Sequence, residues 1–491
     1  MSARIRISFA SAQDSASVMP AQSRHREHWR ASSGAATKAP QAEAQMTHPP
    51  LRLSDITYRR VVIIAMPVVL SNATVPLQGA VDTAIIGNLG SEVYLAGVTL
   101  GAAAIALILQ VFNFLRFGAG ALGAQALGAG DHRRVINVLA RALILAGGIA
   151  GFLIVSQNLL INQILRIFEG SAQAERLAWV YFSIRIWAAP AELANFALMG
   201  WFAGQEQTRR LFEMQLIISA LNIVLNIIFV LGLGMDVDGV ALGTLIAAYV
   251  GVGYGLWRAR QRLRAICPDW RPERARLLNA EELGKLMRLN RDIFLRTILL
   301  VGALTWMTRL GSLQGDVVLA ANGILYQIFH VTTYGLDGFA LAVEALVGQA
   351  IGARNRALLR RSVTVSTIAA FGLAVAMMAG LFIAQTPLIA LFTNVDSVRA
   401  VANSHFFWAA VLPLVGALAF QMDGIFVGAT EGGMLRNGMI VSAALYFLYS
   451  GWAVESWANH GLWAGLWGFL LLRGMTLAAQ YPWLERRAEV D

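Results

Sequence analysis

The feature that most constrains the fold of this chain is a succession of apolar segments, each close to the length of a membrane-crossing α-helix. A helix needs about 20 apolar residues to span a hydrocarbon core of about 30 Å. The 491-residue chain is 57% hydrophobic and only 14% charged, whereas soluble domains carry about a quarter charged residues. The pattern predicts an all-α, polytopic membrane protein.

We expect twelve transmembrane helices. They are predicted at 60–86, 93–127, 134–160, 177–204, 210–233, 238–260, 292–313, 317–351, 358–385, 400–428, 435–454 and 461–482. The segments at 93–127 and 317–351 are longer than one crossing requires, so we expect them to bend or to project from the bilayer.

Arginines indicate the orientation of these spans. They gather on alternate loops, as at Arg133/Arg134, Arg209/Arg210 and 258–291. Loops rich in Arg and Lys stay in the cytoplasm, so both termini are expected there. The same bias accounts for most of the net charge of +10, so it requires no nucleic-acid partner.

The spans fall into two similar halves. The string "GAQALGAGDHRR" from position 123 resembles "GQAIGARNRALLRR" from position 348, and Gln125/Gln349, Phe168/Phe392 and Gly200/Gly424 are each separated by 224 residues. Six spans in each half, an even number, give both halves the same orientation in the membrane. We therefore expect two pseudo-symmetric six-helix lobes with a central cavity.

The domain organisation follows from these halves. We expect a disordered polar tail at 1–50, an N-lobe at 51–260, a basic, helix-poor cytoplasmic linker at 261–291, a C-lobe at 292–485 and a cytoplasmic tail at 486–491. Met46 is an alternative start, and the tail is either functional or the product of an over-extended gene model.

Several strings resemble the multidrug and toxic compound extrusion (MATE) family, in particular its DinF-type branch. They are "AMPVVLSNATVPLQGAVDTAIIGNLGS", "FLRFGAGALGAQALGAG", "LNRDIFLR", "YGLDGFALAVEALVGQAIGAR", "LPLVGALAFQMDGIFVGATEGGMLRN" and "LLRGMTLAA". The resemblance covers nearly the whole chain outside the tail. It implies a transporter of a bacterial inner membrane, with two lobes in a V that alternate access. It also implies export of organic, cationic or amphipathic compounds by antiport with protons or sodium ions.

Asp82 is a carboxylate within the first span. A charge at membrane depth costs at least about 2.5–3.5 kcal/mol, so it persists where it faces a cavity or a partner. The resemblance implies that Asp82 is the proton-binding coupling residue and that Pro67 is where the first helix bends upon protonation. The alternatives are an aspartate wetted by headgroups, since Gly87 follows about one turn later, and a merely tolerated proline kink.

A second polar group accompanies Asp82 in the N-lobe. Asn222 and Asn226 are four residues apart and share one helix face, and the resemblance places them with Gln78 and Thr244 in a pocket around the aspartate. Family members often carry an aspartate where this chain has Asn226. A single carboxylate favours a proton over sodium as the coupling ion, because hard cations prefer several charged oxygens. The asparagines could instead simply link helices.

The C-lobe carries its own acids. Asp337 and Glu344 lie two turns apart on one helix face, and Asp423 follows in a later span. They are candidates either to bind a cationic substrate or to form ion pairs. The candidate partners are the intramembrane arginines Arg116, Arg185, Arg296, Arg309 and Arg473. By the repeat spacing, the C-lobe position equivalent to Asp82 is Trp306, so the lobes are expected to be functionally unequal.

Other functional classes find less support. The only lysines, Lys38 and Lys285, exclude a GxxxxGK[ST] phosphate loop, and no HExxH motif is present. The lone Cys267 excludes a disulfide within the chain and a cysteine-based metal site. We expect a monomer that handles drug-like substrates, and we expect no enzyme activity, cofactor or metal. A channel would need a filter loop, and the remaining alternative is a lipid-linked precursor flippase of a related two-lobe family.

Overall fold

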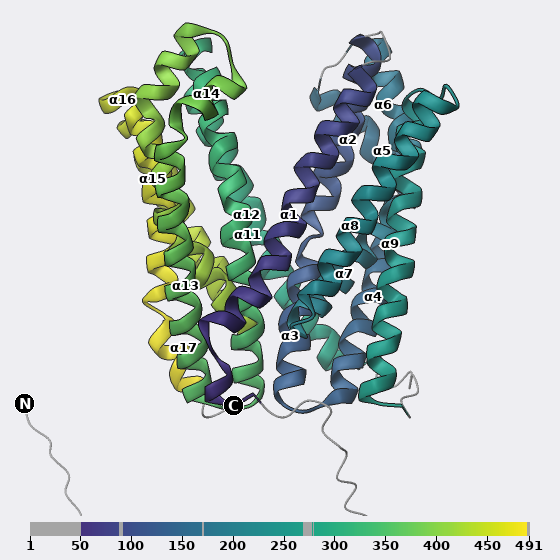
Figure 1. The fold of residues 1–491 in the computed structure, drawn as a ribbon, viewed down its shortest axis with the longest axis vertical. Coiled ribbons are helices and arrows are strands. Elements are labelled where there is room, and N and C mark those ends of the chain that lie inside the picture. The colour runs from purple at the N-terminus through teal and green to yellow at the C-terminus, as the bar shows by residue number, and fades with distance from the viewer. Residues whose placement is uncertain (1–50, 88–91, 169–170, 269–276, 278, 489–491) are drawn as a thin grey trace, which may run out of the picture. The chain divides into compact units, whose positions relative to one another are not determined.

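The computed structural model describes residues 51–87, 92–168, 171–268, 277 and 279–488, all within one compact unit, Thr47–Asp491. The predicted tail at 1–50 and half of the predicted tail at 486–491, namely 489–491, lie outside the described residues. Every regular element in the described part of the chain is helical (Figure 1). The predicted all-α class is therefore confirmed.

The helices of the first half form the N-lobe. They are α1 (Tyr58–Gly87), α2 (Glu92–Val111), α3 (Phe114–Gly128), α4 (His132–Val155), α5 (Gln157–Phe168), α6 (Ala172–Arg185), α7 (Ala189–Gly204), α8 (Thr208–Asn226) and α9 (Val237–Ile266). Short turns of other helix types lie at Leu53–Asp55, Ile186–Ala188 and Ile227–Gly232, the last of these a π-helix that continues α8.

The helices of the second half form the C-lobe. They are α11 (Ala280–Ser312), α12 (Asp316–Gly352), α13 (Arg356–Ile383), α14 (Gln385–Phe392), α15 (Asp396–Gly428), α16 (Gly432–Ala478) and α17 (Tyr481–Arg487). Figure 1 shows the two lobes meeting at one end and diverging toward the other, in the V expected from the sequence.

The twelve predicted crossings are compatible with these helices, although ten described helical stretches are long and apolar enough to span a membrane individually. The span predicted at 177–204 is interrupted at Ile186–Ala188, so neither α6 nor α7 reaches that length. The span predicted at 435–454 and most of the span predicted at 461–482 lie in α16, which is non-helical at Ala458 (φ 47°, ψ −128°). Tyr449 Oη donates to the carbonyl of Gly465 at 2.7 Å. In a straight helix these residues would lie about 24 Å apart, so α16 is a hairpin of two spans.

The expectation of a helix-poor linker is wrong for most of 261–291. The helix α9 continues to Ile266, and α11 already begins at Ala280. The physical reason is a local helix-start signal: the Asn279 side chain accepts a hydrogen bond from the amide of Glu282 at 3.1 Å, and acids occupy the first turn of α11. Within this segment, Arg262 and Arg264 lie on α9, and Arg288 and Arg291 lie on α11.

The two-fold repeat is visible in the backbone itself. Glu206 and Thr430, 224 residues apart, both have positive φ, at 56° and 60°. Asp131 and Asn355 have the same spacing, and each caps the helix that follows by accepting a hydrogen bond from an amide three residues on. Equivalent turns thus connect equivalent helices in the two lobes.

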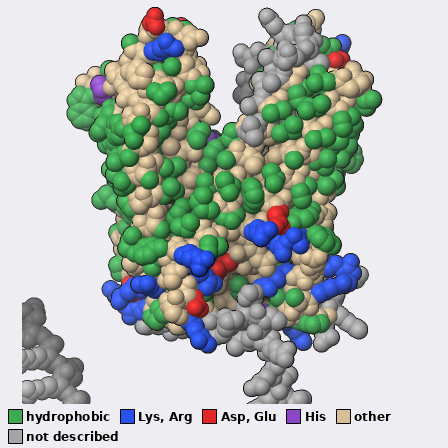
Figure 2. Space-filling model, viewed as in Figure 1, with side chains coloured by type: hydrophobic (Ala, Val, Ile, Leu, Met, Phe, Trp, Pro, Cys, Tyr) green, Lys and Arg blue, Asp and Glu red, His purple; other side chains and the backbone are tan. Residues whose placement is uncertain are grey.

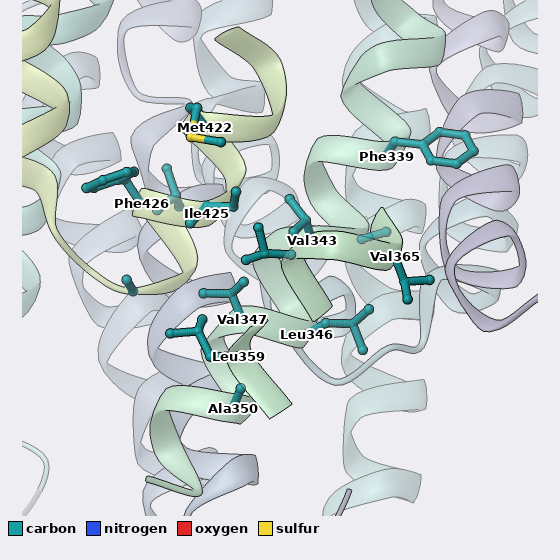
Figure 3. Packing of buried hydrophobic residues seen from close by; sticks show 14 of the residues in the cluster. Phe339, Val343, Leu346, Val347, Ala350, Leu359, Val365, Met422, Ile425 and Phe426 are labelled. Carbon is teal, nitrogen blue, oxygen red and sulfur yellow. The ribbon is translucent and has the colours of Figure 1, made fainter. Parts of the chain in front are cut away.

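The lobes are packed directly against each other where α3 meets α12. A Cβ atom added at Gly128 would overlap the backbone of Gln349, and one added at Gly352 would overlap the backbone of Gln125. Only glycine permits this approach at either position. Beside it, a buried cluster joins α1, α12, α13 and α15 through residues such as Val61, including those labelled in Figure 3.

Lys and Arg side chains gather at the end where the lobes meet (Figure 2). We call this the arginine-rich end; its residues include Arg134, Arg210, Arg258, Arg360 and Arg436, at the ends of α4, α8, α9, α13 and α16 that lie there. Hydrophobic side chains cover the flanks of both lobes, as expected for a surface that faces lipid.

Candidate functional site in the two lobes

A buried polar cluster joins α8 and α9 in the N-lobe. The side chains of Asn222 and Asn226 are fully buried, and Thr244 is nearly so. Asn222 Nδ2 donates to Thr244 Oγ1 at 2.8 Å, and Asn226 Nδ2 donates to Asn222 Oδ1 at 3.4 Å. Gly243 allows this approach, because a Cβ atom there would overlap the amide oxygen of Asn226. The structure brings these three predicted pocket residues together.

The same face of α8 also contacts α1. Ser219, one turn before Asn222, places its hydroxyl 3.2 Å from Gln78 Oε1 and 3.4 Å from Thr74 Oγ1. Thr74 and Gln78 are four residues apart and so share one face of α1. The sequence reasoning missed Ser219 and Thr74. Their spacing of three or four residues from predicted pocket positions was the available signal.

Asp82 lies in α1, one helical turn after Gln78. Its side chain is outside the described part of the structure, so its contacts remain a prediction. Pro67 lies within the same helix, together with Pro76, and α1 is helical throughout Tyr58–Gly87.

The C-lobe counterpart of this cluster is built from aromatic residues. The positions equivalent to Asp82 and Asn226 are Trp306 and Ser450, and Trp306 Nε1 donates to Ser450 Oγ at 3.0 Å. Tyr446, which is equivalent to Asn222, is buried one turn before Ser450. Helix α11 and the first half of α16 therefore contact each other at the two positions that are equivalent to 82 and 226 of the N-lobe.

A cavity of about 530 Å³ lies against the C-lobe helices α11, α12, α15 and α16 and is also lined by residues of α2 and α3 of the N-lobe. Three arginines line it: Arg116 from α3, Arg296 from α11 and Arg473 from α16. Three carboxylic acids also line it, namely Asp337, Glu344 and Asp423. The structure thus brings all three predicted C-lobe acids to one cavity.

Asp423 accepts hydrogen bonds at one oxygen, Oδ2, from Arg296 and from Arg473. Arg473 is 4% exposed, and Asp423 is 8% exposed. Of the two roles considered for these acids, ion pairing therefore describes Asp423 in this structure. Glu344 is also buried, and its Oε1 would lie within 2.7 Å of a Cβ atom at Gly120 on α3.

Two other predicted arginine partners lie outside this cavity. Arg185 Nη2 lies 3.4 Å from Glu192 Oε1, within the N-lobe. The guanidinium of Arg309 lies over the Trp306 ring, 5.2 Å from its centroid, on the exposed side of α11.

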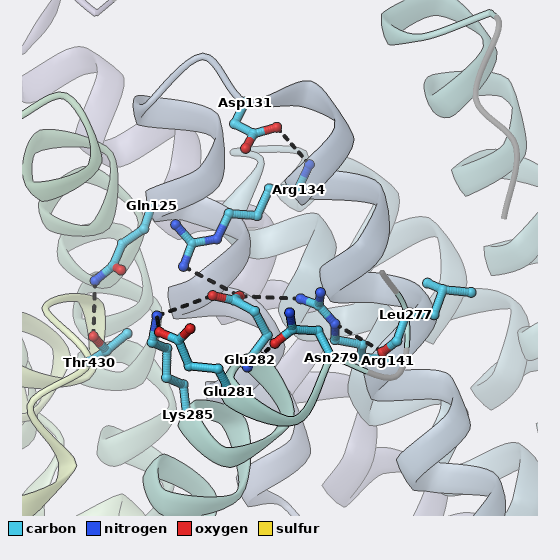
Figure 4. A network of polar contacts seen from close by, with 10 residues as sticks. All are labelled: Gln125, Asp131, Arg134, Arg141, Leu277, Asn279, Glu281, Glu282, Lys285 and Thr430. Carbon is cyan, nitrogen blue, oxygen red and sulfur yellow. Dashed lines mark hydrogen bonds and ion pairs between the residues drawn. The ribbon is translucent and has the colours of Figure 1, made fainter. Parts of the chain in front are cut away.

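Side-chain contacts connect the lobes at the arginine-rich end. Gln125 of the N-lobe donates to Thr430 Oγ1 at 3.2 Å (Figure 4). It also donates to the Gly428 carbonyl at 3.1 Å. Gln349 of the C-lobe donates to Glu206 Oε1 at 2.7 Å. Both glutamines and both acceptor positions, 206 and 430, are related by the repeat.

Glu206 also binds an arginine of α1. Arg60 donates to both carboxylate oxygens of Glu206, at 2.9 and 3.0 Å, and such bidentate pairs are strong and directional. The sequence reasoning missed this contact, because its two residues are 146 positions apart and no local pattern relates them.

The start of α11 is also attached to the N-lobe. Glu282 lies 3.3 Å from Arg141 and 3.6 Å from Arg134, both on α4 (Figure 4). Among the described residues, no group of three or more His, Cys, Asp and Glu side chains is placed to hold a metal ion.

The arrangement of helices is that of known transporters. The fold is similar to a structure described as the outward-facing conformation of a multidrug resistance MATE family transporter of the MOP superfamily (TM-score 0.77, 20% identity, 90% of this chain and 99% of that chain). It is also similar to the Vibrio cholerae MATE transporter VcmN in the bent form (TM-score 0.80, 17% identity, 89% of this chain and 99% of that chain). The molecule therefore has the two-lobe fold of a polytopic membrane transporter.

The chain belongs to the MatE family. The family model matches residues 67–228 and 293–449, one match in each lobe. The chain is 38% identical over 430 residues to DNA damage-inducible protein F of Escherichia coli strain K12, covering 85% of this chain and 90% of that protein. Members of this family are transporters, so the chain is a multi-pass membrane transporter, as the sequence indicated.

Proposed function

We propose that this protein exports amphipathic organic compounds by antiport with protons, and that Asp82 is the residue that takes up and releases the coupling proton. The observation that carries this proposal is the buried polar cluster of α1, α8 and α9. Gln78, Ser219, Asn222, Asn226 and Thr244 form two adjoining hydrogen-bonded groups at membrane depth. Position 82 is the next turn of α1 along this face.

The repeat gives a second argument for this location. Trp306 and Ser450, the equivalents of Asp82 and Asn226, are in direct contact in the C-lobe. The same helix geometry in the N-lobe would place the carboxylate of Asp82 within reach of Asn226. Amide groups there would stabilise a carboxylate that is otherwise costly in the membrane.

The composition of the cluster favours a proton over sodium. Apart from Asp82, its side chains are amides and hydroxyls, which carry no net charge. A sodium ion held there would receive one negative charge from the protein and otherwise neutral oxygens, whereas hard cations are held best by several carboxylates. A proton needs only one carboxylate.

We propose that the arginine-rich end faces the cytoplasm, which leaves the diverging end of the V open to the outside. The positive-inside rule supports this orientation. Helix α1 then connects the two ends: Val61 and Ile64 pack in a cluster with C-lobe residues, whereas Gln78 contacts α8 of the N-lobe. Pro67 lies between these two attachments, at a position where a bend would move one part of α1 relative to the other.

The alternative function, a lipid-linked precursor flippase, finds less support. Recognition of a pyrophosphate group calls for a strongly positive cavity. The C-lobe cavity instead matches its three arginines with three carboxylic acids, Asp337, Glu344 and Asp423.

Transport into or out of proteoliposomes, with pH and sodium gradients imposed separately, tests the proposed function. Substrate movement that follows an imposed pH gradient in sodium-free buffer is the expected result. Transport driven by sodium alone and indifferent to pH would contradict it and would direct attention to the C-lobe acids.

A further inference from the structure

We propose that the C-lobe cavity binds the anionic group of a monoanionic amphiphile, such as a carboxylate or a sulfonate, and that Arg116, Arg296 and Arg473 are its ligands. This inference rests on the proposed transport function and specifies its substrate class. It departs from the expectation, drawn from the sequence, that the C-lobe acids receive a cationic substrate.

The first argument is the count of charges in the cavity. Three arginines and three carboxylic acids line it. Among the other described lining residues, His330 is the one whose side chain can carry a positive charge. Arginine does not lose its proton in proteins, whereas a carboxyl group in apolar surroundings can become neutral by taking one up. The formal charge of the described lining is therefore zero or positive and does not become negative. The cavity therefore offers a cationic ligand no net negative charge.

The second argument is the hydrogen-bonding capacity of the arginines. Each guanidinium carries five N–H donors. Arg296 and Arg473 share a single oxygen of Asp423, and the Nε atoms of all three arginines are buried without a hydrogen-bond partner in the described structure. Buried donors without acceptors are costly. An anionic ligand group would supply the missing acceptors.

The third argument is the position of Arg116. It comes from α3 of the N-lobe, whereas Arg296 and Arg473 come from C-lobe helices. Its guanidinium lies over the Phe117 ring, 4.6 Å from the centroid, and none of the ion pairs found among the described residues involves it. A ligand held by all three arginines would therefore contact both lobes.

The remaining lining suits the apolar body of an amphiphile. Phe117, Leu300, Leu304, Phe329, Phe420 and Leu470 line the same cavity. A volume of about 530 Å³ falls within the range of about 300–1,000 Å³ found for pockets that hold small organic ligands.

Equilibrium binding to the purified full-length protein in detergent tests this assignment with three probes that share one fluorophore. Dansylglycine carries a carboxylate, dansylcadaverine an ammonium group, and dansylamide no charge. We expect dansylglycine to bind at least about tenfold more tightly than dansylcadaverine, which corresponds to about 1.4 kcal/mol. A preference for dansylcadaverine, or equal binding of the two charged probes, would overturn the proposal.

Two substitutions should move the affinity in opposite directions. Arg116→Gln should weaken dansylglycine binding about tenfold and leave dansylamide unchanged, and Asp337→Asn should strengthen dansylglycine binding because it removes a negative charge from the same cavity. Arg309→Gln, on α11 but outside the cavity, is the matched control and should change neither. Equal effects of Arg116→Gln and Arg309→Gln would refute the role of Arg116.

The binding measurement imposes no gradient, so it separates the two proposals. Intact dansylglycine selectivity together with transport that ignores the pH gradient would contradict proton antiport alone. Proton-driven transport by a protein that prefers dansylcadaverine would contradict the anion site alone.

Discussion

Gln349 Nε2 lies 2.7 Å from Glu206 Oε1, and this hydrogen bond joins the C-lobe to the N-lobe at the arginine-rich end. Its repeat-related counterpart joins Gln125 to Thr430 at 3.2 Å. The two contacts have the same geometry in the fold but different chemistry, because one acceptor is a carboxylate and the other is a hydroxyl. In an alternating-access cycle, opening of the arginine-rich end would require both contacts to break.

The charged contact should dominate closure of the arginine-rich end. Hydrogen bonds to charged groups contribute about 1.5–3 kcal/mol and neutral ones about 0.5–1.5 kcal/mol. We expect Glu206→Ala to increase the population in which this end is open, and Thr430→Ala to do so less, because Gln125 retains the Gly428 carbonyl. Spin labels on cysteines introduced at Ala129 and Ala353, in a Cys267→Ser background, would report the separation by pulsed electron paramagnetic resonance. Equal shifts for both variants would contradict this ranking.

Asp82→Asn should insert normally and lose transport driven by a pH gradient. An amide keeps the shape of the side chain but cannot gain and lose a proton in the required way. The matched control is Asp238→Asn, in the first turn of α9, which should retain transport. Full gradient-dependent transport by the Asp82 variant, measured in proteoliposomes, would remove this residue from the mechanism.

Asn226→Asp should make sodium sensitivity appear or increase. A second carboxylate beside Asp82 adds a charged oxygen ligand, and the two like charges raise the affinity of the pair for a proton. Transport assayed across a sodium series at fixed pH checks this, with Ser219→Ala as a control that alters the cluster without adding charge. Indifference of the Asn226 variant to both sodium and pH would show that position 226 is remote from the ion site.

Gly128→Ala should destabilise the protein by about 1–3 kcal/mol, the usual cost of overpacking. The added methyl group would overlap the backbone of Gln349, where α3 and α12 approach most closely. Gly147→Ala in α4 is the matched control, since nothing lies within 4 Å of the added Cβ atom, and it should be neutral or slightly stabilising. Thermal unfolding of the two variants in the same detergent gives the comparison, and equal midpoints would indicate that the lobes are not held this closely.

A reporter fused after Asp491 and a tag inserted near Pro268 should both be cytoplasmic. The arginines at the ends of α4, α8, α9, α13 and α16 place these two sites on the same side of the membrane. Protease protection in right-side-out and inverted vesicles would measure this, and periplasmic exposure of either site would overturn the twelve-span topology.

The sequence was sufficient for the spans and the repeat, because these depend on local periodicity and on one fixed spacing. The resemblance to a known family grouped Asn222, Asn226 and Thr244, and Ser219 and Thr74 were missed. The asparagines at 222 and 226 share a helix face whatever the rest of the chain does. The contact of Arg60 with Glu206 depends on how α1 crosses the arginine-rich end of the molecule. A local periodicity in the sequence does not predict that crossing. The helical start of α11 was missed for a different reason. The high charge of 280–291 favours a loop, whereas the Asn279 cap and the acidic first turn favour the helix that forms.

Aromatic side chains in the C-lobe stand where the N-lobe has its polar cluster, and this difference bears on the number of coupling ions carried in each cycle. A duplicated chain starts with two copies of every site, and a transporter that kept both would carry two coupling ions in each cycle. In the C-lobe, Trp306 and Tyr446 occupy the positions of Asp82 and Asn222, and neither ring offers a carboxylate. If Asp82 is the coupling residue, as proposed, this pair of equivalent sites would bind one coupling ion in each cycle rather than two.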